Sequence, residues 1–127
     1  MARNGKDGSE KASKGKVEWK GFVNVYLNSA DKAAIRANPI SGEGVFRMVE
    51  RLTEEGYKLS VTYSASGGFY TVTCYGSDPS KINAGYAMSL RHGDLSIALS
   101  SINHVMDEDS VGVSWADRFT KVDDHNW

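Results

Sequence analysis

The residues that most often carry catalysis are few in this sequence and far apart. The three histidines are His92, His104 and His125, and Cys74 is the only cysteine. A structural zinc site needs four such ligands close together, and neither their number nor their spacing fits one. Cys74 alternates with apolar residues of a predicted strand, which is typical of a small buried side chain. We therefore expect no metal, no cofactor and no catalytic site.

Two weaker candidates for chemistry have structural explanations. His92 and Asp94 form an acid–base pair in a predicted turn, but Asp94 also stands where a helix needs its N-terminal cap. Gly42-Glu43-Gly44 opens another helix, yet neither a third glycine nor a lysine follows to complete a phosphate loop. We interpret the first as a cap and the second as a flexible helix start.

The sequence is richer in residues that bind by stacking and by charge. Aromatic and basic side chains recur at alternate positions of predicted strands. The expected binding surface consists of Lys20, Phe22, Asn24, Tyr26, Lys58, Phe69, Tyr75 and Arg91. Unpaired bases stack on aromatic rings, cations hold phosphates, and Asn24 can bond base edges or sugars. The bases of a duplex are already stacked on one another, so a single strand fits this surface better.

The first strand that must position these residues is expected at 17–27. Its apolar residues, including Trp19 and Val23, alternate onto one face. Lys20 and Phe22 belong to the residues that alternate onto the other face. The strand therefore predicts one buried face and one aromatic, basic face.

Three further strands are expected at 57–63, 69–75 and 84–91. The serines and glycines of 64–68 predict a hairpin between the first two of these strands. The third strand alternates between larger and smaller side chains. Asp78 and Pro79 precede it, and a helix opened by them is the competing prediction for this region.

Helical segments separate the strands. Ser29, Ser41 and Asp94 each stand where a helix needs an N-terminal cap. The first helix, 30–37, ends ahead of a proline, and the other two each carry one apolar stripe. Gly56 ends the second helix, where a residue of left-handed conformation is common.

These elements predict an α+β fold in the order β-α-β-β-β-α. Because each longer helix is apolar on a single side, the economical packing is an antiparallel four-stranded sheet with helices on one face only. Leu59, Val61, Val72 and Cys74 are expected beneath the helices. The other face stays open and carries the aromatic and basic residues.

The distribution of charge divides the chain into three parts. Residues 1–16 are basic and almost without apolar side chains, so we expect a disordered arm. Residues 17–107 form the single α+β domain, and 108–127 form an acidic tail. Such ends are typical of chains that meet polyanions or basic partners, or they only add solubility. No segment is apolar enough for a membrane span or a secretory signal, and a lone cysteine fits a cytoplasmic protein.

Two segments, Trp19 to Leu27 and Asn83 to Leu90, resemble segments of small phage-encoded single-stranded DNA-binding proteins. This resemblance covers most of the predicted domain and implies a role in phage DNA replication or recombination in the host cytoplasm. The last five residues, Asp123-Asp124-His125-Asn126-Trp127, resemble the acidic C-terminal tip of bacterial single-stranded DNA-binding proteins. That resemblance implies recruitment of a replication protein. Here the tip has fewer acids and ends in Trp rather than Phe.

The expected function is sequence-tolerant binding of single-stranded DNA, or of RNA, by a homo-oligomer. The alternative is a protein-interaction module that uses the same sheet face, such as a phage inhibitor of a host protein or a self-assembling structural subunit. Exposed aromatic residues on strands mark such interfaces. They also pair across strands for stability alone.

Overall fold

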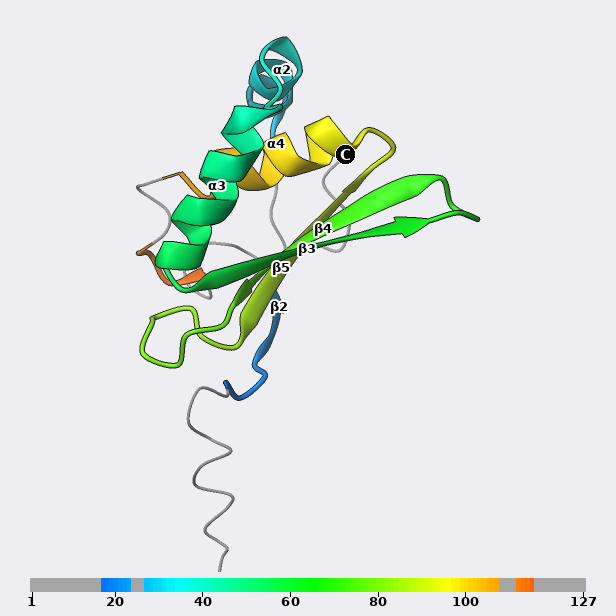
Figure 1. Cartoon of the computed structure of the whole chain (residues 1–127). Helices are drawn as coiled ribbons and strands as arrows, with labels where there is room; N and C mark the ends of the chain where they lie inside the picture. The colour runs from blue at the N-terminus through cyan, green and yellow to red at the C-terminus, as the bar shows by residue number, and fades with distance from the viewer. Residues whose placement is uncertain (1–16, 24–26, 108–111, 116–127) are drawn as a thin grey trace, which may run out of the picture.

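The computed structural model describes residues 17–23, 27–107 and 112–115, which form an α+β fold (Figure 1). The elements are β2 (Gly21–Val23), α2 (Ser29–Ala37), α3 (Glu43–Glu54), β3 (Tyr57–Ser64), β4 (Phe69–Gly76), β5 (Tyr86–His92) and α4 (Leu95–Val105). The α+β class is confirmed. The order is β-α-α-β-β-β-α: both helices predicted between the first two strands are present, although the predicted order counts them as one.

The four strands form one mixed sheet in the order β2-β5-β4-β3. β3 pairs with β4 and β4 with β5 in antiparallel fashion, but β2 runs parallel to β5. The prediction of a wholly antiparallel sheet is therefore wrong. Side chains alternate between faces in both kinds of strand, so alternation does not report strand direction. β5 is antiparallel to β4 and therefore runs in the same direction as β3. β2 runs in this direction too, and α2 and α3 connect it to β3.

The strand predictions within 57–92 are confirmed. The β3–β4 hairpin is in register without interruption from Tyr57 opposite Gly76 to Ser64 opposite Phe69. Its turn is closed by a hydrogen bond that the Gly68 N–H donates to the Ser64 carbonyl over 2.7 Å. β5 is a strand, so the competing helix prediction for this region is excluded.

The helix starts differ in part from their predictions. The cap of α2 is Asn28 rather than Ser29, and Asn28 and Asp31 form a reciprocal capping box with distances of 2.8 and 3.2 Å. α3 begins after Gly42, which makes no side-chain cap, so the predicted cap by Ser41 is wrong. The predicted cap of α4 is confirmed, because Asp94 accepts a hydrogen bond from the Ser96 N–H over 2.9 Å.

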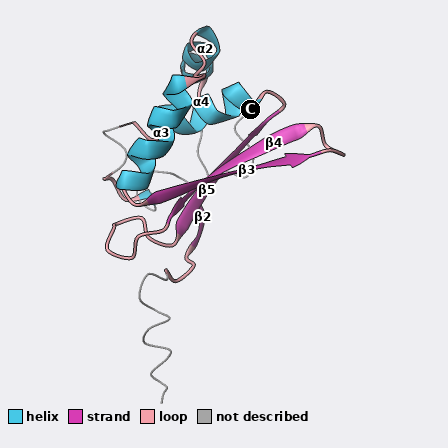
Figure 2. Ribbon diagram, viewed as in Figure 1, coloured by secondary structure: helices cyan, strands magenta, loops and turns pink. Residues whose placement is uncertain are grey.

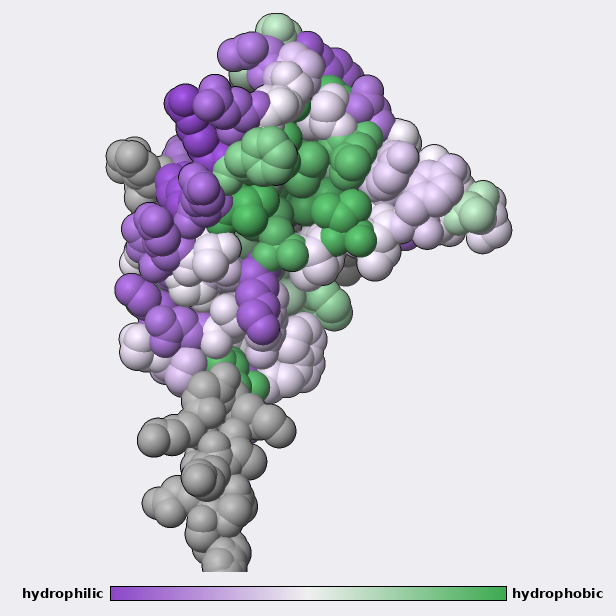
Figure 3. Space-filling model, viewed as in Figure 1, coloured by the Kyte–Doolittle hydropathy of each residue, from purple (hydrophilic) through white to green (hydrophobic). Residues whose placement is uncertain are grey.

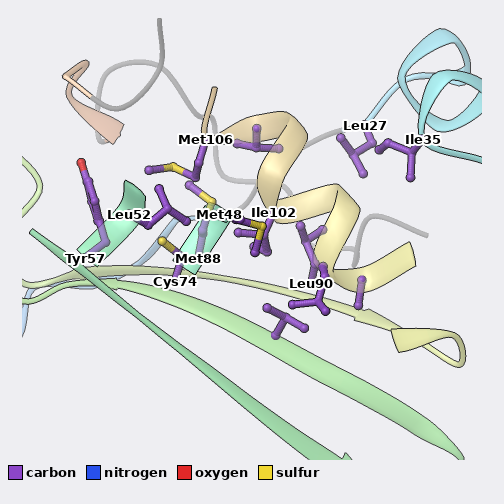
Figure 4. Close-up of a cluster of buried hydrophobic side chains, with 14 of the residues drawn as sticks. Leu27, Ile35, Met48, Leu52, Tyr57, Cys74, Met88, Leu90, Ile102 and Met106 are labelled. Atoms are coloured by element: carbon purple, nitrogen blue, oxygen red, sulfur yellow. The ribbon is translucent and has the colours of Figure 1, made fainter. Parts of the chain in front are cut away.

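All three helices lie on one side of the sheet (Figure 2). α3 packs on β3, and α4 packs on β4 and β5. Figure 4 shows Met48, Leu52 and Ile102 pointing from these helices towards Met88 and Leu90 of the sheet, and all five side chains are buried. This one-sided core is what the apolar stripes of the helices predict.

The buried side chain of Asn83 connects three distant parts of the chain. Its amide donates to the Tyr57 hydroxyl and to the Val113 carbonyl, each over 2.8 Å. Its oxygen accepts from the Trp115 N–H over 2.7 Å. The Trp115 ring is buried and stacks on Tyr57 with 5.1 Å between centroids. The packed core therefore reaches Trp115, beyond the predicted domain boundary at residue 107.

Replacement of Asn83 by alanine tests this network. The change removes the Asn83 hydrogen bonds to the Tyr57 hydroxyl and the half-buried Val113 carbonyl, and it leaves the buried Trp115 N–H without the Asn83 oxygen. We expect the free energy of unfolding to fall by about 2–4 kcal/mol, because each buried polar group left unpaired costs roughly 1–3 kcal/mol. Urea denaturation followed by far-UV circular dichroism measures it. Asn38→Ala, at an exposed position, is the matched control, and an equal loss in both variants would contradict this role.

Candidate functional site

The sheet face opposite the helices carries the candidate site. Residues that pair directly across neighbouring strands point to the same face, so the strand register defines rows of side chains. The first row across β2, β5, β4 and β3 is Phe22, Ala87, Tyr75 and Lys58. The next two rows are Ser89, Thr73, Ser60 and then Arg91, Thr71, Thr62. We call these three rows, with Trp19 and Phe69, the open face.

Three aromatic rings form a cluster at one end of the open face. The Phe22 ring meets Trp19 edge-on with 5.1 Å between centroids, and Tyr75 stacks on Trp19 at 6.3 Å. Trp19 is 54% exposed and Phe22 is 62% exposed. Ala87 lies between Phe22 and Tyr75 in its row and is almost fully buried. The cluster therefore presents ring surface to solvent while it covers a small residue beneath.

Trp19 is the member of this cluster that sequence reasoning missed, since alternation from Val23 predicts it on the helix side. The strand begins only at Gly21, whose φ of 132° is a conformation that other residues rarely adopt. The backbone turn at Gly21 breaks the alternation and brings Trp19 to the same face as Phe22. A glycine inside a predicted strand is the signal that could have indicated the break.

A close backbone contact holds the segment that carries Trp19. The Lys20 N–H donates to the Gly85 carbonyl over 2.9 Å. A Cβ at Gly85 would lie 2.2 Å from the Glu18 carbonyl oxygen, and φ at Gly85 is 90°. Only glycine fits both the space and the conformation, so the loop before β5 accommodates the segment that leads into β2.

Lys20 does not join the open face. Its ammonium lies over the Tyr86 ring, 5.7 Å from the centroid. Tyr86 is two residues before Met88 in β5 and so shares the face that the helices cover. The predicted position of Lys20 beside Phe22 is therefore wrong, for the same reason that misplaced Trp19.

Five of the eight predicted residues share the open face. Phe22 and Tyr75 belong to the aromatic cluster, and Lys58 ends their row at the exposed edge strand. At the far end the Arg91 guanidinium lies 5.1 Å from the centroid of Phe69. Asn24 and Tyr26 lie outside the described residues.

Hydroxyl groups occupy the middle of the open face. The Thr73 and Ser89 hydroxyls are hydrogen-bonded to each other over 2.8 Å. Ser60 and Thr62 continue their rows on β3 and are exposed. Since each hydroxyl both donates and accepts, this band can bond sugars or base edges without selecting one base.

The groups considered for catalysis have structural roles here. Burial raises the pKa of the Cys74 thiol to about 12, so thiolate is scarce at neutral pH. The Asp94 N–H donates to His92 Nδ1 over 2.9 Å. This hydrogen bond within a turn accounts for the proximity of the two residues. Hydrogen bonds from Ser96 lower the pKa of Asp94, as expected for a capping carboxylate.

No cluster of three metal-binding side chains occurs among the residues that the structure describes. None of the helices in the same residues is long and apolar enough to cross a bilayer. In comparisons with known proteins, no family model, no curated sequence and no solved structure matches the chain. The candidate site therefore depends on its own geometry.

Truncation of one open-face ring and of one core residue checks that this face is solvent-exposed. Phe22→Ala should lower the free energy of unfolding by less than about 1 kcal/mol, because the ring already faces solvent. Leu90→Ala, on the helix side, should cost about 2–5 kcal/mol, because it leaves a cavity in the core. Urea denaturation of both variants gives the comparison, and similar losses would show that both faces are buried.

Proposed function

We propose that the chain binds single-stranded DNA on the open face with little preference for sequence. The observation that carries this proposal is the cluster of the exposed Trp19 and Phe22 with the half-buried Tyr75, on a sheet face that none of the described helices covers. Stacking one base on an aromatic ring contributes roughly 1–3 kcal/mol and tolerates any base, since every base has a π-face.

The placement of the cations supports the same proposal. Lys58 extends the row of the aromatic cluster by one strand, and Arg91 with Phe69 lies towards the other end of the hairpin. From Tyr75 to Phe69 the strand β4 spans six residue steps, or about 20 Å. Phosphates of a strand stacked on the cluster can therefore reach a cation at either end, with the hydroxyl band between them.

The biological setting is part of the proposal and follows from the resemblance of the segments 19–27 and 83–90. Both segments contribute to this end of the sheet, since the first contains β2 and the second contains most of β5. The proposed setting is phage DNA replication or recombination.

Fluorescence titration with a poly-dT oligonucleotide tests the proposal. At low salt we expect quenching of tryptophan emission, because Trp19 is exposed and stacks on a base while Trp115 is buried. In a Trp127→Phe background, where Trp19 and the buried Trp115 are the two remaining tryptophans, Trp19→Phe should keep most of the affinity but lose most of the quenching. Poly-rU and a blunt duplex are the comparison ligands. Absence of poly-dT binding at low salt would overturn the proposal and leave a protein-interaction module as the alternative for this face.

Matched aromatic variants locate the binding surface. Phe22→Ala should weaken poly-dT binding about 5- to 150-fold, which corresponds to one lost stacking contact. Phe46→Ala is the control, because Phe46 is a comparably exposed phenylalanine on α3, on the other side of the sheet. An equal loss of affinity in both variants would contradict binding on the open face.

Matched arginine variants measure the electrostatic part. The logarithm of the binding constant should fall with the logarithm of salt concentration, by about 0.7 for each phosphate held. Arg91→Gln should reduce this slope by about that amount. Arg47→Gln on α3, at an exposed position remote from the open face, should leave it unchanged. A slope that Arg91→Gln does not alter would remove Arg91 from the site.

A further inference from the structure

The strand β3 is an edge of the sheet with its outer side unpaired among the described residues. The Ser77 N–H donates to the Gly56 carbonyl over 2.9 Å, one step beyond the pair of Tyr57 and Gly76, and this is one of the two bonds of a hydrogen-bonded pair; the Gly56 N–H bonds instead to the Thr53 carbonyl. Such pairs alternate along an antiparallel ladder, so the even-numbered residues of β3 bond to β4. Leu59, Val61 and Tyr63 therefore direct their backbone N–H and C=O groups outwards.

This edge lacks the usual protection against pairing with another chain. Natural edge strands are blunted by proline, bulges, charges or short length. β3 has eight residues in unbroken register with β4, contains no proline, and carries one charged residue, Lys58. Its outer side is a long, regular row of backbone donors and acceptors.

An apolar patch adjoins the edge on the helix side. Val61 and Tyr63 of β3 are 46% and 56% exposed, and Phe46 and Val49 of α3 are 69% and 39% exposed. Figure 3 shows apolar side chains gathered over α3 and the neighbouring sheet. Single exposed apolar residues are ordinary, but a contiguous group beside a free strand edge is typical of an interface.

We propose that two copies of the chain dimerise through β3, paired antiparallel about a two-fold axis at Val61. Val61 then lies opposite its own copy, and Leu59 lies opposite Tyr63, so the outward backbone groups of each copy bond to those of the other. In the register centred on Val61, Tyr57 does not pair with the other copy, and its side chain is already buried in its own chain. A two-fold axis perpendicular to the sheet keeps all helices on one side and makes one continuous eight-stranded sheet.

The charges near the edge suit a second copy as the occupant. Lys58 lies opposite Ser64, and the two lysines are six residue steps apart, or about 20 Å, so they do not repel strongly. The two-fold axis also reverses α3 relative to its copy. The first half of α3, with the exposed ion pair of Arg47 and Glu43 at 3.4 Å, is then directed towards the half of the other helix that carries the exposed acids Glu50 and Glu54, which Arg47 can bond in addition.

The mass of the full chain in solution, measured by light scattering without nucleic acid, tests this proposal independently of the proposed function. The expected mass is twice 13.9 kDa. Val61→Lys should give the monomer, because it places two charges together on the axis. Phe22→Lys is the control, because Phe22 is an exposed residue of the opposite edge strand and should leave the dimer intact. A monomeric wild-type chain at about 100 μM, or a dimeric folded Val61→Lys variant, would overturn the dimer.

A cross-link tests the axis without destabilising the sheet. Opposed residues of a hydrogen-bonded pair have Cα atoms about 5.5 Å apart, which suits a disulfide. Val61→Cys should therefore form a covalent dimer under mild oxidation, seen on a non-reducing gel. Phe22→Cys should stay largely monomeric on the gel, and Cys74 is buried and does not compete. Equal cross-linking of the two variants, or none in Val61→Cys, would contradict pairing through β3.

Discussion

One-sided burial of the sheet is the constraint on which the rest of the structure depends. The described helices bury the side chains of β4 and β5 on one face but leave Val61 and Tyr63 of β3 exposed there, and the side chains of these strands alternate between the two faces. Every residue of β4 or β5 at an odd number of positions from Val72, Cys74 or Met88 in its own strand must then point to the open face. The open face is thus a consequence of the core, and its rows of side chains inherit the register that the core requires.

The parts of the fold that follow from local pattern were predictable from the sequence. Alternation and the hairpin turn defined β3 and β4, and the helical period with Asp94 defined α4. Five residues of the candidate site followed, because their strands are regular. Local pattern does not contain strand order or direction, so the parallel edge pairing of β2 with β5 was not predictable from it.

The remaining features depend on contacts between residues far apart in sequence. The Asn83 side chain meets Tyr57 and Trp115, which are 26 and 32 residues away, and no periodicity signals such a meeting. At β2 one backbone angle determines which side chains reach the open face. The conformation of Gly21 moves Trp19 to the open face and Lys20 away from it, which exchanges a cation for a ring in the candidate site.

The position of Cys74 gives this fold a built-in probe of its own opening. The thiol lies on the buried side of β4 with none of its surface exposed. A thiol reagent can reach it only when helices and sheet separate, and the chain has no second cysteine to obscure the signal. The labelling rate in native buffer therefore reports how often the helical layer lifts from the sheet, a motion that reagents acting on the outer face do not detect.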